Sequence, residues 1–596
     1  MFFNDLNLNK QDKLYLFLLT IFILVITYRL MDFQMSGGIY SPDESLYLIS
    51  AFKYAGLDYY NICDVNDLFY TPVISYLTSL LLRLGIDGHF SISFVTAIFG
   101  IFSIYGMYVL LKNRFTPLLC LTGSILFGSF TIFLLNFASG LIDIPGVSVS
   151  IWMMIFGIIA IDNNPKYFYI LFPLTVVGFF TRYTSIFTLP IIFLYYLIKR
   201  DIISEIDNFI SDRSLFNHKM KGYFKSSEFK IIFSSILISV IFTILLCKFT
   251  LFDYNAKLGF FDLSAVTLHV SNTNTNAIDY NGSKLFYIFG LLNDFSFGFV
   301  RDFNFELNFL IYFIMFCGLI FKLINLVFNF NSLKNFKSNF KTKYLNIVLS
   351  VLMIFSVIMS FIEFKYLLNH LISNIFFCIS ILLFFSLVKE FKINEDLQSL
   401  NLIMFSWFCV YFIFISLYPI KTYRYALPFL PSIVYFVIYG LDSILETIIF
   451  GFGKKINKKE INLKYSYLNC TKIIPIVLIL IFVISSFSHI ACWEIEENPV
   501  ASIAHINNKG YINDLVNVTD YIKINDPDYH SKTFGCYGHP SRMIRYYLQT
   551  NITFADNDAK LIDSSGVDYV IINEKINFNN FHEIYNCGEY YLYYHN

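Results

Sequence analysis

The chain has 596 residues, of which 56% are hydrophobic and only 14% charged, and its mean hydropathy is +0.59. This composition excludes an ordinary soluble protein, because soluble domains carry about a quarter of charged residues. Lysine plus arginine number 43, as do aspartate plus glutamate, so no excess of positive charge indicates a nucleic-acid partner.

About thirteen apolar segments have the length, roughly 18–22 residues, that crosses a hydrocarbon core as a helix. They are 14–31, 90–111, 117–136, 143–161, 167–181, 183–198, 230–250, 306–328, 345–362, 366–388, 400–418, 426–447 and 472–490. Lysine and arginine are concentrated before the first span and after the even-numbered ones, and the positive-inside rule places these segments in the cytoplasm. We therefore predict an all-α polytopic membrane protein with a cytoplasmic N-terminus and an extracytoplasmic C-terminal region.

The first outer loop, residues 32–89, carries Ser41-Pro42-Asp43-Glu44 shortly after the first apolar segment. Two adjacent carboxylates are costly near a membrane unless something uses them. Asp43 could be a general base or a ligand for a substrate at the membrane face. Alternatively, Ser-Pro-Asp-Glu only begins the next helix. The apolar run 73–84 is too short to span, and predicts an interfacial helix or half of a re-entrant span.

Two further charged residues stand at the ends of apolar spans. Asp143 begins the fourth span just before Pro145, where the helix dipole favours a carboxylate, so it either faces a site or only caps the helix. Arg182 lies between two apolar runs and either binds a phosphate or substrate or extends to the interface. The polar outer loop 251–303 is long enough to cover an outer site.

A later outer loop combines cations with aromatic residues. It contains Lys421, Arg424 and Tyr425, and it leads into a span that has two early prolines. The two cations could hold a phosphate or diphosphate at the membrane face. The alternative is an aromatic belt with cations that extend to the interface.

Residues 491–596 lack the hydropathy of the preceding chain and predict a small α/β domain outside the membrane. The strand-like runs are 533–537, 567–573 and 590–594, and the helix-like runs are 515–524 and 542–548. Cys536 and Cys587 lie in this region and could form a disulfide outside the cell. The predicted division is thus a membrane domain, 1–490, followed by an outer domain, 491–596.

Four short stretches together resemble the GT-C superfamily of integral-membrane glycosyltransferases, and within it the protein mannosyltransferases and lipid A aminoarabinose transferases. They are Pro42-Asp43-Glu44, the aromatic-Pro stretch Phe69 to Tyr76, Asp143-Ile144-Pro145, and Arg424-Tyr425-Ala426-Leu427-Pro428 with Pro431. Thr71 replaces one of the two prolines usual in the second stretch. The resemblance implies inverting transfer of a sugar from a polyprenyl-phosphate carrier to a protein, lipid or glycan acceptor on the outer face.

The resemblance also implies roles for the charged residues. Asp43 would take the proton of the acceptor hydroxyl, and Glu44 would orient Asp43 or bind the acceptor. Arg182, Lys421 and Arg424 would stabilise the lipid phosphate as it leaves. Asp143 and Tyr425 are further candidates for binding the substrate or the lipid phosphate. No metal-ligand cluster is apparent, but some relatives use a divalent cation, so that option stays open.

Two other classes of protein are alternatives. A transporter or flippase of lipid-linked sugars would need charges spread through the spans, whereas here they gather at one face, and no internal repeat is evident. A non-enzymatic envelope protein would bind its partner through the outer domain. The Trp-Trp-Asp-Tyr-Gly signature of oligosaccharyltransferases is absent, since the tryptophans are Trp152, Trp407 and Trp493.

Overall fold

The computed structural model describes most of the chain apart from several loops and two expected spans. The described residues are 9–39, 41–63, 68, 72–200, 226–254, 287, 310–318, 320, 395–417, 423–453, 461–495, 509–537, 541–556 and 559–596. The expected spans 345–362 and 366–388 lie outside these ranges, as do most of 306–328 and nearly all of the loop 251–303.

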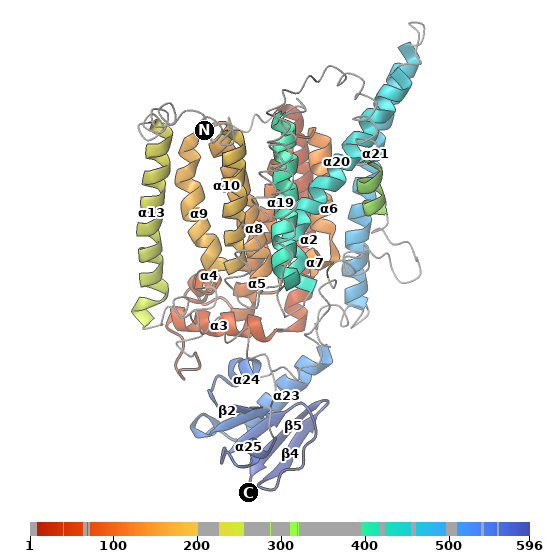
Figure 1. Cartoon of the computed structure of the whole chain (residues 1–596). Helices are drawn as coiled ribbons and strands as arrows, with labels where there is room; N and C mark the ends of the chain where they lie inside the picture. Colours follow the sequence, from red (N-terminus) through yellow and green to blue (C-terminus); the bar gives the residue numbers. More distant parts are fainter. Residues whose placement is uncertain are drawn as a thin grey trace.

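A bundle of helices forms the membrane part of the molecule (Figure 1). Its helices are α2 (Lys10–Gly37), α5 (Gly88–Lys112), α6 (Pro117–Ser129), α7 (Thr131–Asn136), α8 (Asp143–Asp162), α9 (Phe168–Thr181), η3 (Tyr183–Phe187), α10 (Thr188–Lys199), α13 (Ser227–Thr250), α19 (Glu395–Leu417), η7 (Tyr423–Phe429), α20 (Leu430–Gly453) and α21 (Ile461–Ile495). Seven helices in the described ranges are long and apolar enough to cross a membrane. The prediction of a polytopic helical membrane protein is confirmed, while the count of thirteen spans stays a prediction.

Helix α8 lies at the centre of the bundle and α13 at its edge. Helix α8 packs against α5, α9 and α10, and its glycine Gly157 allows Ile192 of α10 to approach closely. On α13, by contrast, Phe233, Ile241 and Ile244 are 52–63% exposed. A stripe of exposed apolar side chains this long is stable against lipid rather than water.

A buried ion pair joins α2 to α5 at the end of the bundle near the N-terminus (Figure 1). The Asp12 side chain is fully buried, and its Oδ1 lies 3.0 Å from Lys112 Nζ and accepts a hydrogen bond from the Tyr108 hydroxyl at 2.9 Å. The other oxygen accepts from the backbone N–H of Asn9 at 2.8 Å, which caps the helix.

The Lys112→Ala variant is expected to lose about 3–5 kcal/mol of stability, because it leaves the Asp12 carboxylate buried without its counter-charge. A lower Tm of the detergent-solubilised protein would report this loss. Lys199→Ala is the control, with an expected effect below about 1 kcal/mol. Lys199 pairs with the partly exposed Asp162, which keeps its 2.6 Å hydrogen bond from Tyr195. Equal Tm changes in the two variants would contradict the prediction.

Two short helices of the segment 32–89 cover the opposite end of the bundle. Helix α3 (Pro42–Ala55) lies across the helix ends, and α4 (Pro72–Leu82) packs against it and against α5 (Figure 1). Ser41 caps α3, since its Oγ accepts a hydrogen bond from the backbone N–H of Asp43 at 3.2 Å. Helix α4 has 11 residues, too few to cross a bilayer.

The C-terminal region forms a five-stranded sheet with helices. Its elements are α23 (Lys509–Asn525), β1 (Phe534–Tyr537), α24 (Ser541–Leu548), β2 (Ile552–Asp556), α25 (Ala559–Asp563), β3 (Tyr569–Ile572), β4 (Phe581–Cys587) and β5 (Tyr590–His595). The strand order is β2-β1-β3-β5-β4, with β1 parallel to β2 and β3, and β5 antiparallel to β3 and β4. The predicted small α/β domain is confirmed, while its exact boundary at residue 491 stays a prediction.

The predicted disulfide between Cys536 and Cys587 is wrong, since both cysteines are free. Cys536 lies in β1 and Cys587 in β4, with β3 and β5 between them. Neighbouring strands are about 4.8 Å apart, so the two backbones are separated by about 14 Å. A disulfide needs Cα atoms within about 7 Å.

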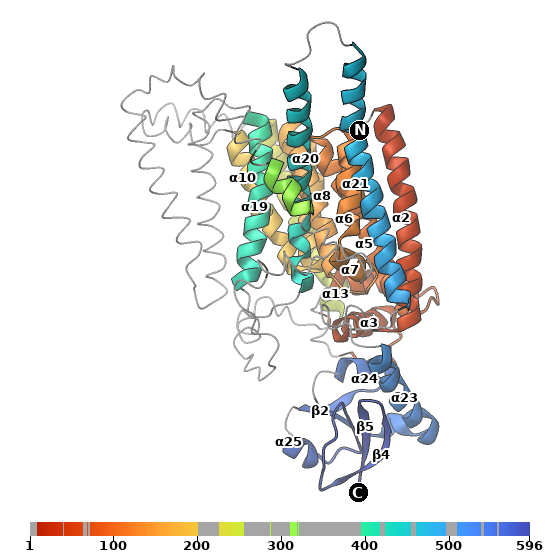
Figure 2. The same cartoon turned by 90° about the vertical axis from the view of Figure 1, so that its right-hand side faces the viewer.

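The sheet domain lies below the end of the bundle that carries α3 (Figures 1 and 2). Its helix α24 lies on the side of the sheet domain that faces the bundle (Figure 1), and it packs directly against α3. The N-terminus lies at the opposite end of the bundle. The beginning of α3, where Asp43 lies, is therefore placed between the bundle and the sheet domain.

Candidate active site

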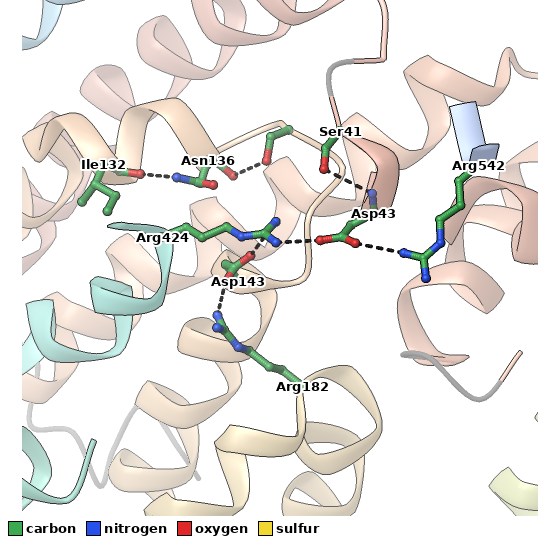
Figure 3. A network of polar contacts seen from close by, with 9 residues as sticks. Ser41, Asp43, Ile132, Asn136, Asp143, Arg182, Arg424 and Arg542 are labelled. Atoms are coloured by element: carbon green, nitrogen blue, oxygen red, sulfur yellow. Dashed lines mark hydrogen bonds and ion pairs between the residues drawn. The ribbon is translucent and has the colours of Figure 1, made fainter. Parts of the chain in front are cut away.

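Asp43 occupies the first turn of α3 and forms ion pairs with two arginines from distant parts of the chain. Its Oδ2 lies 2.6 Å from Arg424 Nη2, and its Oδ1 lies 3.2 Å from Arg542 Nη1. Figure 3 shows the two guanidinium groups on opposite sides of the carboxylate. The helix dipole and both arginines stabilise the ionised form of Asp43. The stretch around Asp43 therefore both begins α3 and places a carboxylate in a charged network, so the two interpretations of its sequence are compatible.

Arg424 also connects Asp43 to a second carboxylate. Its Nη1 lies 3.9 Å from Asp143 Oδ2, and the other oxygen of Asp143 forms an ion pair with Arg182 (Figure 3). The Arg182 side chain is only 9% exposed, so it is held in the protein rather than extended to the interface. The Tyr425 ring lies 5.5 Å from the Arg182 guanidinium carbon and 5.6 Å from that of Arg424.

Glycines make room for these charged side chains. A Cβ atom on Gly146, in α8, would lie 2.8 Å from Cβ and Cδ of Arg182, so only glycine lets this side chain pass along the helix toward Asp143. Gly140, in the loop before α8, has φ +68°, and a Cβ there would lie 2.6 Å from the Glu44 side chain. The two glycines thus provide the space that the side chains of Glu44 and Arg182 occupy.

Glu44, the residue after Asp43, is fully buried. Its Oε1 lies 3.6 Å from Nε2 of His89, in the first turn of α5. The loop residue Gly140 covers it on another side. This buried position holds the beginning of α3 against α5 and so helps to place Asp43.

Five of the seven predicted site residues lie together, and a sixth, Glu44, contacts His89 instead. Asp43, Asp143, Arg182, Arg424 and Tyr425 lie in one network, whereas Lys421 lies outside the described residues. Three guanidinium groups face the carboxylates of Asp43 and Asp143, which leaves one positive charge in excess at this network, suited to an anion such as a phosphate.

Sequence reasoning missed two residues of the site, His89 and Arg542. No local signal singles out either one, since His89 follows a helix cap and Arg542 lies in an ordinary amphipathic helix of the sheet domain. Within the described ranges, no group of three His, Cys, Asp or Glu side chains is arranged to hold a metal ion. The option of a divalent cation stays a prediction.

The fold has a counterpart among solved structures. It is similar to apo ArnT from Cupriavidus metallidurans, with a TM-score of 0.51 and 8% identity over 97% of each chain. ArnT from Cupriavidus metallidurans bound to undecaprenyl phosphate aligns with a TM-score of 0.49 and 10% identity, covering 96% of this chain and 97% of that one. Archaeal oligosaccharyltransferase AglB from Archaeoglobus fulgidus, in complex with an inhibitory peptide and a dolichol-phosphate, aligns with a TM-score of 0.44 and 11% identity, covering 93% of this chain and 69% of that one.

Residues 70–209 match the family model described as dolichyl-phosphate-mannose-protein mannosyltransferase. The matched segment contains Asp143 and Arg182, while Asp43 and Arg424 lie outside it. No curated protein sequence matches the chain. The predicted resemblance is confirmed, and so is the prediction of a glycosyltransferase, which rests on this family match rather than on the structural likeness.

Proposed function

We propose that this protein transfers a sugar from a polyprenyl-phosphate carrier to a protein, lipid or glycan acceptor on the outer membrane face. The observation that carries the proposal is the shared arginine: Arg424 contacts both Asp43 and Asp143. A candidate base and the cations suited to a lipid phosphate thus lie within one network. The matched family is described as using dolichyl-phosphate-mannose, which supports this donor class.

In the proposed reaction, the acceptor hydroxyl attacks the anomeric carbon of the sugar. Asp43 takes the hydroxyl proton as the new carbon–oxygen bond forms. The bond between the anomeric carbon and the phosphate oxygen breaks, and its electron pair stays on the lipid phosphate. Because this is a single displacement, the configuration at the anomeric carbon inverts. Arg424 and Arg182 stabilise the negative charge that develops on the phosphate.

The remaining site residues have supporting roles. Glu44, buried against His89, orients the beginning of α3 rather than binding the acceptor. Tyr425 packs beside both arginines and limits their movement. Lys421 precedes Arg424 by three residues and is a further candidate for the lipid phosphate.

The orientation in the membrane is part of the proposal. The Lys/Arg distribution puts the N-terminus in the cytoplasm, and the sheet domain and the site lie at the other end of the bundle (Figure 1). The transferase domain is then 1–490 and the extracytoplasmic domain 491–596. A site on the outer face can use a lipid-linked sugar and needs no nucleotide-binding motif.

The test is a transfer assay in sealed, right-side-out membrane vesicles from cells that express the chain. Radiolabelled sugars on polyprenyl phosphate are supplied in turn, and label is expected to leave the lipid fraction for an acceptor in the vesicles. Vesicles without the chain are the control. If no lipid-linked sugar is consumed while labelled lipid crosses the bilayer in a chain-dependent way, the protein is a flippase and the proposal is wrong.

A further inference from the structure

The outer sheet domain supplies a charged side chain to the candidate site. Arg542 is the second residue of α24. Its guanidinium forms an ion pair with the Asp43 carboxylate, which belongs to the membrane part of the chain (Figure 3). Residues 42–55 and 541–548 pack together as α3 and α24. The contact between the sheet domain and the bundle therefore includes an ion pair to the candidate base.

Four other contacts hold the sheet domain in this place. The Tyr546 ring stacks on Phe52 of α3 with centroids 6.1 Å apart. The Tyr547 hydroxyl accepts a hydrogen bond from the backbone N–H of Ile39 at 3.3 Å. Further contacts are the hydrogen bond from Arg545 Nη1 to the Ile62 carbonyl, 3.3 Å, and the stacked rings of Tyr60 and His530, 3.8 Å apart. All of them join the sheet domain to the first outer loop, so they fix the position of the domain relative to Asp43.

The two arginines hold different oxygens of the same carboxylate. Arg424 comes from the membrane bundle and contacts Oδ2, while Arg542 comes from the sheet domain and contacts Oδ1. Together they determine the direction and plane of the carboxylate. A carboxylate offers about four acceptor positions, so two ion pairs do not exhaust its capacity to accept a proton from a substrate hydroxyl.

We propose that Arg542 is a positioning residue for Asp43, through which the outer domain completes the transferase site. The proposal rests on the proposed function of Asp43 as general base. It assigns to residues 491–596 a part in the reaction, in addition to any part in binding the acceptor. Removing the Arg542 guanidinium removes the ion pair at Oδ1 of Asp43, so that the carboxylate turns more freely and is less well placed for the attack.

The test compares Arg542→Ala, Arg542→Lys and Tyr547→Phe in the full-length protein. Arg542→Ala is expected to lower kcat about fivefold, with the donor KM unchanged, because both partners of this ion pair are about one third exposed. Arg542→Lys keeps the charge and is expected to recover most of the rate. Tyr547→Phe removes a hydrogen bond that holds the domain and leaves Asp43 untouched, so its kcat should stay near that of the unmodified protein.

The pH–rate profile gives a second readout that a purely structural role would not change. A cation beside a carboxylate favours its ionised form, so its loss moves the acid limb to higher pH, by about 0.5–1 pH unit in Arg542→Ala. The charged and titratable groups around Asp43 that stay in place are Glu44, Tyr47, Asp143, Arg182, Arg424 and Tyr425. Burial raises the pKa of Tyr547 to about 12, so Tyr547→Phe does not change the charge near neutral pH.

Three results would overturn the inference. The first is an Arg542→Ala variant with unchanged kcat and an unchanged acid limb. The second is a rise in donor KM with kcat unchanged, which would make Arg542 a ligand of the donor. The third is a Tyr547→Phe variant with the same losses, which would place the effect in domain docking alone. If Asp43→Asn is fully active, the proposed function itself fails, and this outcome is distinct from the three.

Discussion

Asp43→Asn is expected to lower the rate of sugar transfer by about 100- to 10,000-fold, the range over which a general base contributes to catalysis. Asparagine has nearly the same shape but cannot accept the proton of the acceptor hydroxyl. The variant also loses the negative charge that both Arg424 and Arg542 contact. The measurement is the initial rate of transfer in membranes supplied with polyprenyl-phosphate sugar, normalised to the amount of folded protein.

The matched control for this variant is Asp253→Asn. Asp253 is an exposed carboxylate in η4 (Phe252–Tyr254), at the end of α13 that faces the same side as the site. Its neutralisation tests for a general effect of charge at this membrane face, and its transfer rate should be near that of the unmodified protein. Undiminished transfer by a well-folded Asp43→Asn variant would rule out Asp43 as the base.

The second large effect is expected for Arg424→Ala, in the use of the lipid donor. The Arg424–Asp43 pair is part-buried and hydrogen-bonded, so the loss is expected at the lower end of the range for such charge pairs, about 2 kcal/mol, and kcat/KM for the donor should fall about 30-fold. Arg424 contacts both Asp43 and Asp143, so part of the loss will appear in kcat. The measurement is the dependence of transfer on the concentration of polyprenyl-phosphate sugar.

Arg424→Ala is expected to fold, because Asp143 keeps its ion pair with Arg182. Size-exclusion chromatography in detergent checks this. Arg83→Ala is the control, since Arg83 lies in the first outer loop and donates to the Tyr54 carbonyl, outside the network around Asp43. Identical donor dependence in Arg424→Ala and the unmodified protein would remove Arg424 from the phosphate site.

The helices of the membrane part were predictable from the sequence because their signal is local. A run of apolar residues must form its backbone hydrogen bonds within the segment when it lies in lipid, so length and hydropathy suffice. The predicted runs 14–31, 90–111 and 143–161 lie within α2, α5 and α8. The expected span 117–136, however, is divided into α6 and α7 at Phe130, whose backbone is extended.

In the sheet domain, the sequence predicted the inner strands and missed the edges. Strands β1, β3 and β5 lie inside the sheet and correspond to the predicted runs 533–537, 567–573 and 590–594. Strands β2 and β4 are the two edges, and β4 has a polar-interrupted sequence, Phe-His-Glu-Ile-Tyr-Asn-Cys. An edge strand has fewer neighbours to bury it, so its apolar pattern is weaker.

By itself, the sequence determined that charged residues stand at the ends of apolar spans, because a charge in that place is costly unless it has a partner. It therefore indicated Asp43, Asp143, Arg182 and Arg424 as candidate site residues. Only the tertiary structure decided which of them pair, since Asp43 is 381 residues from Arg424 and 499 from Arg542. Pairing over such distances depends on how α3, η7 and α24 pack together, and no local pattern in the chain encodes that geometry.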